Sequence, residues 1–250
     1  MKIVWEECGG GSPLLLIQGL GYARWSWDPV VPGLAVNHRV VFFDNRGIGE
    51  SDKPDGPYTA REMANDALQV LDEARVERAH VLGASLGGMI AQELAVAAPE
   101  RVDRLVLCST TPGGPDTVPM PEVTVQLLAE APTLAPEVAL RRFVENALGA
   151  DPPAELVDEI FERRIANPLD PAGWQAQAAA GIGFQGVDRD IAAPTLVLAG
   201  TGDNVVDRRN SDVLAARIPG ARVEWFEGAG HLFFWERPGE FVRIVSDFLK

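Results

Sequence analysis

The sequence predicts an α/β protein with a mostly parallel, doubly wound sheet of about eight strands and an inserted helical cap. Short apolar runs alternate with stretches of helical periodicity, which is the pattern of a parallel sheet covered on both faces. This alternation stops after Thr111 and resumes at Ala193. We therefore expect a core domain formed by residues 1–112 and 190–250, interrupted by a cap of residues 113–189.

Six apolar runs are the expected strands of the sheet. Strands that are buried on both faces appear in a sequence as continuous apolar segments, because neither side chain row meets water. The six runs cover residues 14–17 (LLLI), 40–43 (VVFF), 79–83 (AHVLG), 104–108 (RLVLC), 195–199 (TLVLA) and 222–226 (RVEWF).

Three core segments between these runs have helical periodicity. The first begins at a capping box, in which Thr59 caps the helix and Glu62 lies in its first turn. The second is expected to run from Ser85 to Pro99, and the third covers residues 239–249. The residues expected to face the core are Met63, Ala67, Val70, Leu71 and Ala74, then Met89, Ile90 and Leu94, and finally Phe241, Ile244, Val245 and Phe248.

The predicted cap follows a linker rich in proline and glycine, TPGGPDTVPMP. The chain beyond it is rich in alanine and helical in pattern, with candidate helices at residues 123–131, 135–148 and 154–166. A crossover connection with its helix needs only about ten to twenty residues. Because this segment is several times longer, we expect an insertion that could form a lid.

Ser85 lies between Gly83 and Gly87, after an expected strand and before an expected helix. Glycines in these places let strand and helix approach closely around a tight turn that exposes the serine hydroxyl. A dinucleotide-binding fingerprint would have its central glycine where Ser85 stands, so we interpret Ser85 as a nucleophile. The amide of Leu86, at the helix start, is expected to donate to the oxyanion that forms.

A serine nucleophile needs a base and a group that orients this base, and both are expected later in the chain. Asp203 and His231 each come just after an expected strand, at the sheet edge where ligands bind in open parallel sheets. We expect His231 to take the proton of Ser85 and Asp203 to hold the imidazole. Asp207, four residues beyond Asp203, is the alternative acid.

The remaining histidines and Cys108 are expected to have structural and not catalytic roles. His80 lies within an apolar run and is expected to be a core histidine with satisfied hydrogen bonds, whereas His38 is expected at the surface. Cys108 ends a strand without a nearby histidine and is expected to be a buried, inert thiol. With three histidines and two cysteines and no clustered pair, we expect no metal site.

Five motifs carry a family resemblance: IQGLG, DNRGIGESDKP, LGASLGG, GTGD and GAGH. In these motifs the chain resembles the α/β-hydrolase superfamily, in particular its serine esterase and 3-oxoadipate enol-lactonase-like branch. The resemblance implies a second oxyanion donor, the backbone amide of Leu20 after Gly19. Relatives usually have His-Gly where this chain has Gln18-Gly19. Since Gln18 can both donate and accept, we expect it to replace the histidine in fixing the loop.

The resemblance implies hydrolysis of a carboxylic ester or (enol-)lactone through an acyl-enzyme, without a cofactor. It argues against the haloalkane dehalogenase and epoxide hydrolase branches, which attack with aspartate. Two alternatives stay open: a C–C bond hydrolase of the meta-cleavage-product type, and a ligand-binding receptor with slow turnover. The candidate substrate-pocket residues are Gly19, Trp25, Trp174, Phe184 and Leu232.

Charge and hydropathy indicate the expected partners and location. A formal net charge of −14 repels nucleic acid and anionic membranes, so the expected partner is a small ester or lactone. No apolar run reaches the length of a membrane span, and the first residues lack the basic start and apolar run of a signal peptide. We therefore expect a cytoplasmic monomer or homodimer.

Overall fold

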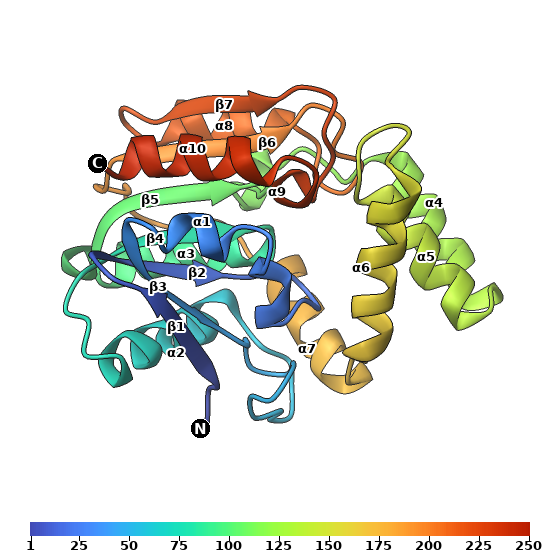
Figure 1. The fold of residues 1–250 in the computed structure, drawn as a ribbon, viewed down its shortest axis with the longest axis horizontal. Helices are drawn as coiled ribbons and strands as arrows, with labels where there is room; N and C mark the ends of the chain where they lie inside the picture. The colour runs from blue at the N-terminus through green and yellow to red at the C-terminus, as the bar shows by residue number, and fades with distance from the viewer.

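The computed structural model describes residues 1–250 and contains one seven-stranded sheet with helices on both faces (Figure 1). The strand order is β1-β3-β2-β4-β5-β6-β7, and all neighbours are parallel except β1 and β3. The strands are β1 (Trp5–Gly9), β2 (Ser12–Ile17), β3 (His38–Phe43), β4 (Ala79–Ala84), β5 (Val102–Cys108), β6 (Thr195–Gly200) and β7 (Arg222–Phe226). The predicted fold class is confirmed, with seven strands where about eight were expected.

All six predicted apolar runs are strands of this sheet. The strand that the sequence did not reveal is β1, which pairs antiparallel with β3 at the edge of the sheet. Its residues are mostly exposed, so it has no continuous apolar run by which it could be predicted.

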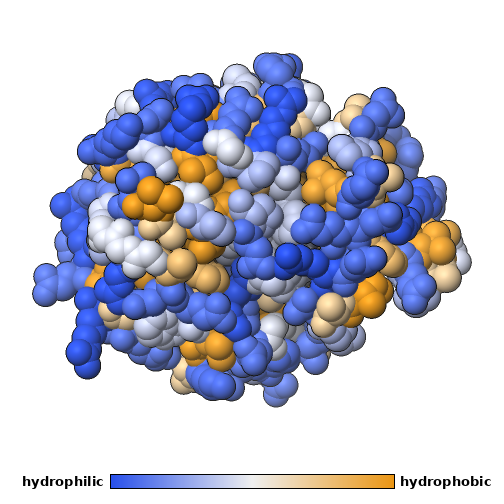
Figure 2. Space-filling view, viewed as in Figure 1, coloured by the Kyte–Doolittle hydropathy of each residue, from blue (hydrophilic) through white to orange (hydrophobic).

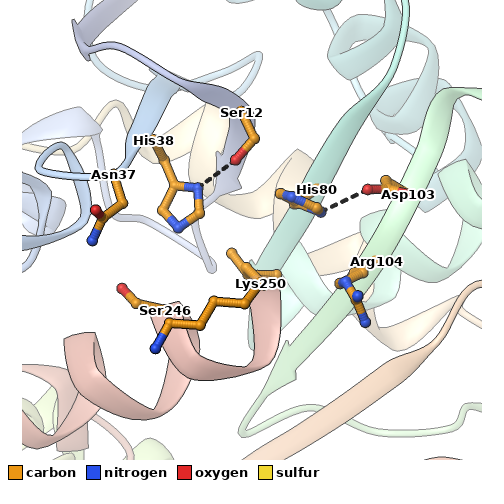
Figure 3. A pocket seen from close by; sticks show the side chains of 9 residues that line it. Ser12, Asn37, His38, His80, Asp103, Arg104, Ser246 and Lys250 are labelled. Carbon is orange, nitrogen blue, oxygen red and sulfur yellow. Dashed lines mark hydrogen bonds and ion pairs between the residues drawn. The ribbon is translucent and has the colours of Figure 1, made fainter.

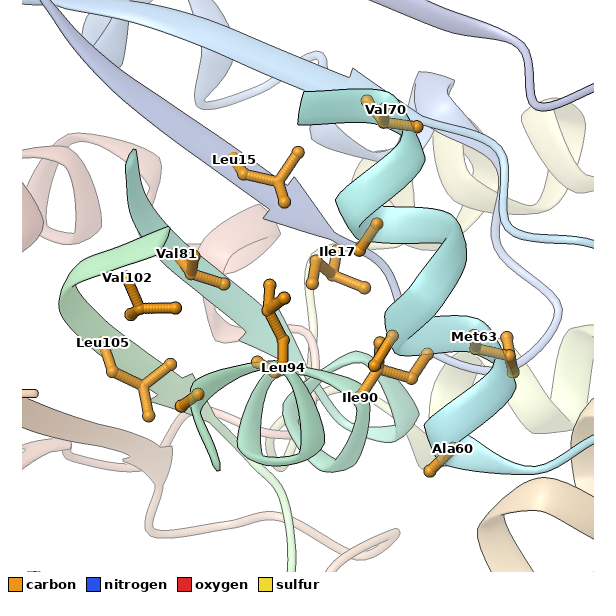
Figure 4. Packing of buried hydrophobic residues seen from close by; sticks show 14 of the residues in the cluster. Leu15, Ile17, Ala60, Met63, Val70, Val81, Ile90, Leu94, Val102 and Leu105 are labelled. Atoms are coloured by element: carbon orange, nitrogen blue, oxygen red, sulfur yellow. The ribbon is translucent and has the colours of Figure 1, made fainter. Parts of the chain in front are cut away.

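One face of the sheet is covered by α2 (Ala60–Glu73), α3 (Leu86–Ala97) and α8 (Arg209–Arg217), which share a buried apolar cluster. Figure 4 shows the side chains of α2 and α3 meeting those of β2, β4 and β5 in this cluster. The capping box at the start of α2 is formed, because Thr59 Oγ1 accepts from the Glu62 amide and Glu62 accepts from the Thr59 amide. The predicted core face of α2 is buried along its whole length.

The other face is covered by α1 (Val31–Leu34), α9 (Phe233–Glu236) and α10 (Pro238–Leu249). Aromatic rings dominate this second cluster, with the centroids of Phe226 and Phe233 4.5 Å apart and those of Phe233 and Phe241 5.8 Å apart. In α10, Phe241 and Val245 are buried while Ile244 is partly buried, so the predicted face points inward.

Four helices lie between β5 and β6, namely α4 (Glu122–Glu130), α5 (Pro136–Asn146), α6 (Ala154–Ala166) and α7 (Pro171–Ile182). The three candidate helices of the sequence correspond to α4, α5 and α6, and Figure 1 shows these beyond the carboxyl ends of the parallel strands. Apolar side chains of α4 and α5 are exposed, at the right of the surface in Figure 2, where most of the visible face is hydrophilic. None of the helices is both long and apolar enough to cross a membrane.

Glycine allows α3 to begin directly against the sheet. A Cβ atom at Gly87 would collide with the carbonyl oxygen of Ile17 in β2, and one at Gly83 would collide with the carbonyl oxygen of Gly87. The first turn of α3 therefore lies against the backbone at the carboxyl end of β2 and β4.

This packing predicts that Gly87→Ala destabilises the fold. The added methyl group meets backbone that cannot rotate away, so we expect a loss on the order of 2 kcal/mol in the free energy of unfolding, measured by urea denaturation. Gly239→Ala is the matched control, because Gly239 is also the second residue of its helix and has open space around it. It should be neutral or stabilising by up to about 1 kcal/mol. Equal stabilities of the two variants would contradict the packing argument.

Candidate active site

Ser85 has a strained backbone at the turn between β4 and α3. Its φ of 55° and ψ of −119° are rare for a residue with a side chain and cost about 1–3 kcal/mol. Three hydrogen bonds hold this conformation: the Ser85 amide donates to Cys108 O at 2.8 Å, and Ser85 O accepts from Thr110 Oγ1 at 2.7 Å and from the Gly88 amide at 2.9 Å. Such a turn projects the hydroxyl from the carboxyl edge of the sheet.

Asp203 and His231 are paired at the same edge of the sheet. His231 Nδ1 lies 2.8 Å from Asp203 Oδ2, and the side chain of Asp203 is 1% exposed. The other carboxylate oxygen of Asp203 accepts from the amides of Val205 and Val206 at 2.8 and 2.9 Å. Because a carboxylate only accepts, Nδ1 of the imidazole is the donor in this pair and Nε2 of the neutral ring is left as an acceptor.

The alternative acid, Asp207, faces a different partner. Its carboxylate accepts from the guanidinium of Arg209 at 2.9 and 2.7 Å, which lowers the pKa of Asp207 below its usual value. The structure therefore brings Asp203 to His231 and leaves Asp207 in a surface ion pair.

The loop that carries His231 is held on both sides of the histidine. The amide of Gly230 donates to Glu236 Oε2 at 2.7 Å, and the amide of Leu232 donates to Ala147 O at 2.9 Å. The second oxygen of Glu236 accepts an amide from the connection between α5 and α6. The inserted helices therefore help to fix the position of the histidine.

The short helix α9, which follows the loop of His231, is joined to the segment after β2. Trp235 Nε1, four residues after His231, donates to Ser26 O at 3.0 Å, in the segment that follows β2. In the strand order, β4, which precedes Ser85, lies between β2 and β7. Ser85 Oγ makes no hydrogen bond here, so the expected contact with His231 is not formed; such contacts often tighten only when substrate binds.

The loop after β2 lies against Ser85. A Cβ atom at Gly19 would be 3.0 Å from Ser85 Cβ and 3.6 Å from Ser85 Oγ. Gln18 fixes this loop, because its Oε1 accepts from the Gly19 amide at 2.7 Å and its Nε2 donates to Ser26 Oγ at 2.5 Å. The carbonyl of Gln18 also accepts from Asn45 at 2.9 Å. Gln18 thus fixes the loop through its own hydrogen bonds, as expected for a residue that replaces the usual histidine.

The two expected oxyanion donors are free to bind a ligand. The amide of Leu20 donates no hydrogen bond within the chain, and the amide of Leu86 is at the first position of α3, where a helix offers no acceptor. Leu86 follows Ser85 directly, and Leu20 follows Gly19. Two unpaired amides beside a serine hydroxyl can stabilise a developing oxyanion.

The other candidate pocket residues lie in different surroundings. Trp174 of α7 contacts the loop, since a Cβ at Gly21 would be 2.9 Å from its ring. Trp25 is partly buried, with its ring centroid 6.0 Å from that of Trp235. Phe184 and Leu232 are buried in the two apolar clusters.

Cys108 is fully buried at the end of β5, and burial raises the pKa of its thiol. Its backbone carbonyl accepts from the Ser85 amide. This fits the expected structural role. No three of the His, Cys, Asp and Glu side chains are placed to hold a metal ion.

A cavity of about 460 Å³ lies at the opposite, amino-terminal edge of the sheet (Figure 3). Ligands of open parallel sheets bind at the carboxyl edge, so this basal cavity is not the candidate active site. It is lined by Ser12, Asn37, His38, His80, Asp103, Arg104, Ser246, Leu249 and Lys250.

The basal cavity shows that the expected surface position of His38 was wrong. His38 is 4% exposed, because it is the first residue of β3 and packs beside β2, where its Nδ1 lies 2.8 Å from Ser12 Oγ. His80 is buried as predicted, but its Nδ1 makes no hydrogen bond and lies 3.4 Å from Asp103 Oδ2. Burial lowers the pKa of both imidazoles, and Asp103 partly opposes this at His80.

Two residues that bond to the loops of the site, Gln177 and Glu236, could not be predicted from the sequence. The side chain of Gln177 accepts from the backbone amide of Gly21, which is remote in the sequence. The side chain of Glu236 accepts from the backbone amide of Gly230, in the loop that carries His231. Neither residue belongs to a motif, and such contacts follow only from the path of the folded chain.

The chain belongs to the alpha/beta hydrolase fold family, whose family model matches residues 12–238. It is 33% identical to RutD of Azorhizobium caulinodans, named as a candidate carbamate hydrolase, over 98% of this chain and 94% of that protein. It is 32% identical to a 2-hydroxy-6-oxononadienedioate/2-hydroxy-6-oxononatrienedioate hydrolase of Cupriavidus pinatubonensis, covering 96% of this chain and 87% of that protein. The enol-lactonase structure from Burkholderia xenovorans superposes with a TM-score of 0.84 at 28% identity, covering 99% and 96% of the two chains. The family supports assignment of the chain as a hydrolase.

The two basal histidines predict a loss of stability in acid. A histidine with a lowered pKa in the folded chain stabilises the fold above its unfolded pKa and loses this contribution as the pH falls through its folded pKa. The free energy of unfolding should therefore decrease from about pH 7.5 to about pH 5.5 in urea denaturation experiments.

The double variant His38→Gln, His80→Gln should show a smaller decrease over the same interval. His231→Gln, which removes the third histidine and leaves the basal pair intact, should keep it. An unchanged pH dependence in the double variant would contradict this assignment.

Proposed function

We propose that the chain is a serine hydrolase that cleaves a carboxylic ester or a lactone through an acyl-enzyme. The observation that carries the proposal is the Asp203–His231 pair at the sheet edge that presents Ser85 on a strained turn. An oriented imidazole, a projecting hydroxyl and two free amides are the groups that acyl transfer requires.

In the proposed reaction, Ser85 Oγ attacks the carbonyl carbon while His231 Nε2 takes the hydroxyl proton. Asp203 accepts from Nδ1 and stabilises the imidazolium that forms. The amides of Leu20 and Leu86 stabilise the oxyanion of the tetrahedral intermediate. The intermediate collapses as the alcohol leaves with the proton from His231, and a water molecule then cleaves the acyl-enzyme by the same route.

We further propose that residues 113–189 act as a cap over this site. Their helices lie beyond the carboxyl ends of the strands (Figure 1), where the reacting groups also are. Trp174, whose ring lies against Gly21 beside Leu20, is the cap residue that we expect to contact a substrate. The expected substrate is a small molecule.

C–C bond hydrolysis of a meta-cleavage type of product is the second candidate. The relative from Cupriavidus pinatubonensis, named for a dienedioate substrate, supports it. The same histidine and aspartate would activate Ser85 for attack on a ketone carbonyl, so both reactions use one set of groups.

We expect hydrolysis of some members of a panel of p-nitrophenyl esters of increasing chain length, small lactones, an aryl carbamate and a vinylogous 1,5-diketone. Ser85→Ala should reduce kcat/KM at least about 1,000-fold, because it removes the nucleophile. Cleavage of the diketone alone would favour the second candidate. Undiminished activity in Ser85→Ala would contradict both, and binding without turnover would indicate a receptor.

The acid is tested by a matched pair of variants. Asp203→Asn should lower kcat about 1,000-fold to 10,000-fold, because an amide favours the wrong imidazole tautomer. Asp207→Asn breaks an exposed pair with Arg209 and should leave kcat within about threefold of the wild type. The reverse order of the two effects would show that the acid is misassigned.

A further inference from the structure

Of three successive backbone amides in the loop after β2, the outer two donate to glutamine side chains and the central one has no acceptor. The Gly19 amide donates to Gln18 Oε1 at 2.7 Å, and the Gly21 amide donates to Gln177 Oε1 at 3.1 Å. The amide between them, that of Leu20, has no acceptor within the chain. Two glutamine side chains therefore occupy the flanking donors and leave only the central one free.

Gln177 reaches this loop from the inserted helix α7 and is completely buried. Besides accepting from Gly21, it donates through Nε2 to Arg46 O at 2.7 Å, in the segment that follows β3. Both ends of its amide are thus used, and they join the loops after two neighbouring strands. A buried amide with both groups satisfied has one favourable orientation, because any rotation would leave buried donors or acceptors unpaired.

The helix that carries Gln177 is itself fixed to the core. A Cβ at Gly173 would collide with the carbonyl oxygen of Gly47, and the Tyr58 amide donates to Ala176 O at 3.2 Å. These contacts lie within one turn of Gln177. The part of the cap that holds the loop is therefore packed against the core backbone.

A second cap residue binds the other backbone group of Gly21. Arg164 of α6 donates to Gly21 O at 2.5 Å, and its guanidinium lies 4.5 Å from the centroid of the Tyr22 ring. Together, Gln177 and Arg164 bind the amide and the carbonyl of Gly21, the residue directly after Leu20.

We propose that Gln177 is a positioning residue that orients the Leu20 amide toward the oxyanion. The inference rests on the proposed function, since it assigns Leu20 as an oxyanion donor. Gln177 acts through Gly21 and touches neither substrate nor Ser85. The cap then has a role in the chemical step, through a helix that holds the oxyanion loop, in addition to any role in covering the substrate.

A residue that positions a donor affects the transition state more than the ground state. The substrate carbonyl is neutral before attack and carries negative charge afterward, so a misdirected Leu20 amide costs mainly kcat. A residue that only stabilises the fold would instead lower the unfolding midpoint and leave the kcat of the folded enzyme unchanged.

The test compares Gln177→Met, Gln177→Glu and Gln175→Met in the full chain. Methionine keeps the shape of glutamine but makes neither hydrogen bond, whereas glutamate keeps the acceptor for the Gly21 amide. Gln175 is exposed on the same helix and is the matched control. For each variant, kcat and KM are measured on the best ester or lactone of the wild type, with the Ki of phenylboronic acid and the thermal unfolding midpoint. Phenylboronic acid forms a tetrahedral adduct on a serine oxygen and so reports the oxyanion site.

We expect Gln177→Met to lower kcat about 10-fold to 100-fold, with KM changed less than about threefold. The Ki of phenylboronic acid should rise by the same factor by which kcat/KM falls. Gln177→Glu should retain more activity than Gln177→Met, and Gln175→Met should match the wild type. If Gln177→Met does not fold, Gln177→Asn carries the same test, because its amide stays polar but is one methylene shorter and is drawn back from the Gly21 amide; the same loss of kcat and of boronate affinity is expected.

Unchanged kcat and boronate affinity in a folded Gln177→Met would overturn the inference while the proposed function stands. A wild type without activity that depends on Ser85 would overturn the proposed function itself, and the inference with it.

Discussion

The backbone of Ser85 is the constraint on which the rest of the site depends. A residue with φ of 55° at the junction of β4 and α3 is stable only where its surroundings impose that conformation. Here the Ser85 amide donates to the end of β5, and the Ser85 carbonyl accepts from Thr110 in the segment that follows. Close packing of α3 on the ends of β2 and β4, which Gly83 and Gly87 allow, sets where the turn lies. The same packing places the free amide of Leu86 beside the serine and brings the loop after β2 within contact of it.

The helices between β5 and β6 contact three loops of this edge. The loop with Asp203 is joined to α4 by the hydroxyl of Thr124, which donates to Asn204 O. The loop with His231 is joined to the end of α5 through the carbonyl of Ala147, and the loop with Leu20 is joined to α7 through Gln177. An insertion with contacts of this kind behaves as part of the scaffold of the site. Motion of all these helices together would break hydrogen bonds at each of these places, so opening of a local segment costs less free energy than displacement of the entire insertion.

Much of the fold could be predicted from the sequence, because buried parallel strands and amphipathic helices have strong patterns. The exposed edge strand β1 lacks such a pattern and was missed. Ser85, Asp203 and His231 could be identified as candidates because each follows a strand in a glycine-containing motif, and the structure pairs the last two. His38 was misplaced because its polar neighbours in the sequence hide its burial under α10. Gln177 and Glu236 could not be found, since their partners are backbone amides that become neighbours only through the path of the folded chain.

The central claim is that Ser85 is the nucleophile, and covalent labelling tests it most directly. A fluorophosphonate reacts with a serine whose proton is taken by a neighbouring base and leaves a stable adduct on its oxygen. Intact mass and tryptic peptide mapping should give one adduct, on the peptide of residues 79–101, in which Ser85 is the only hydroxyl-bearing side chain. A label on a different peptide, or no label on an enzyme that hydrolyses esters, would contradict the account.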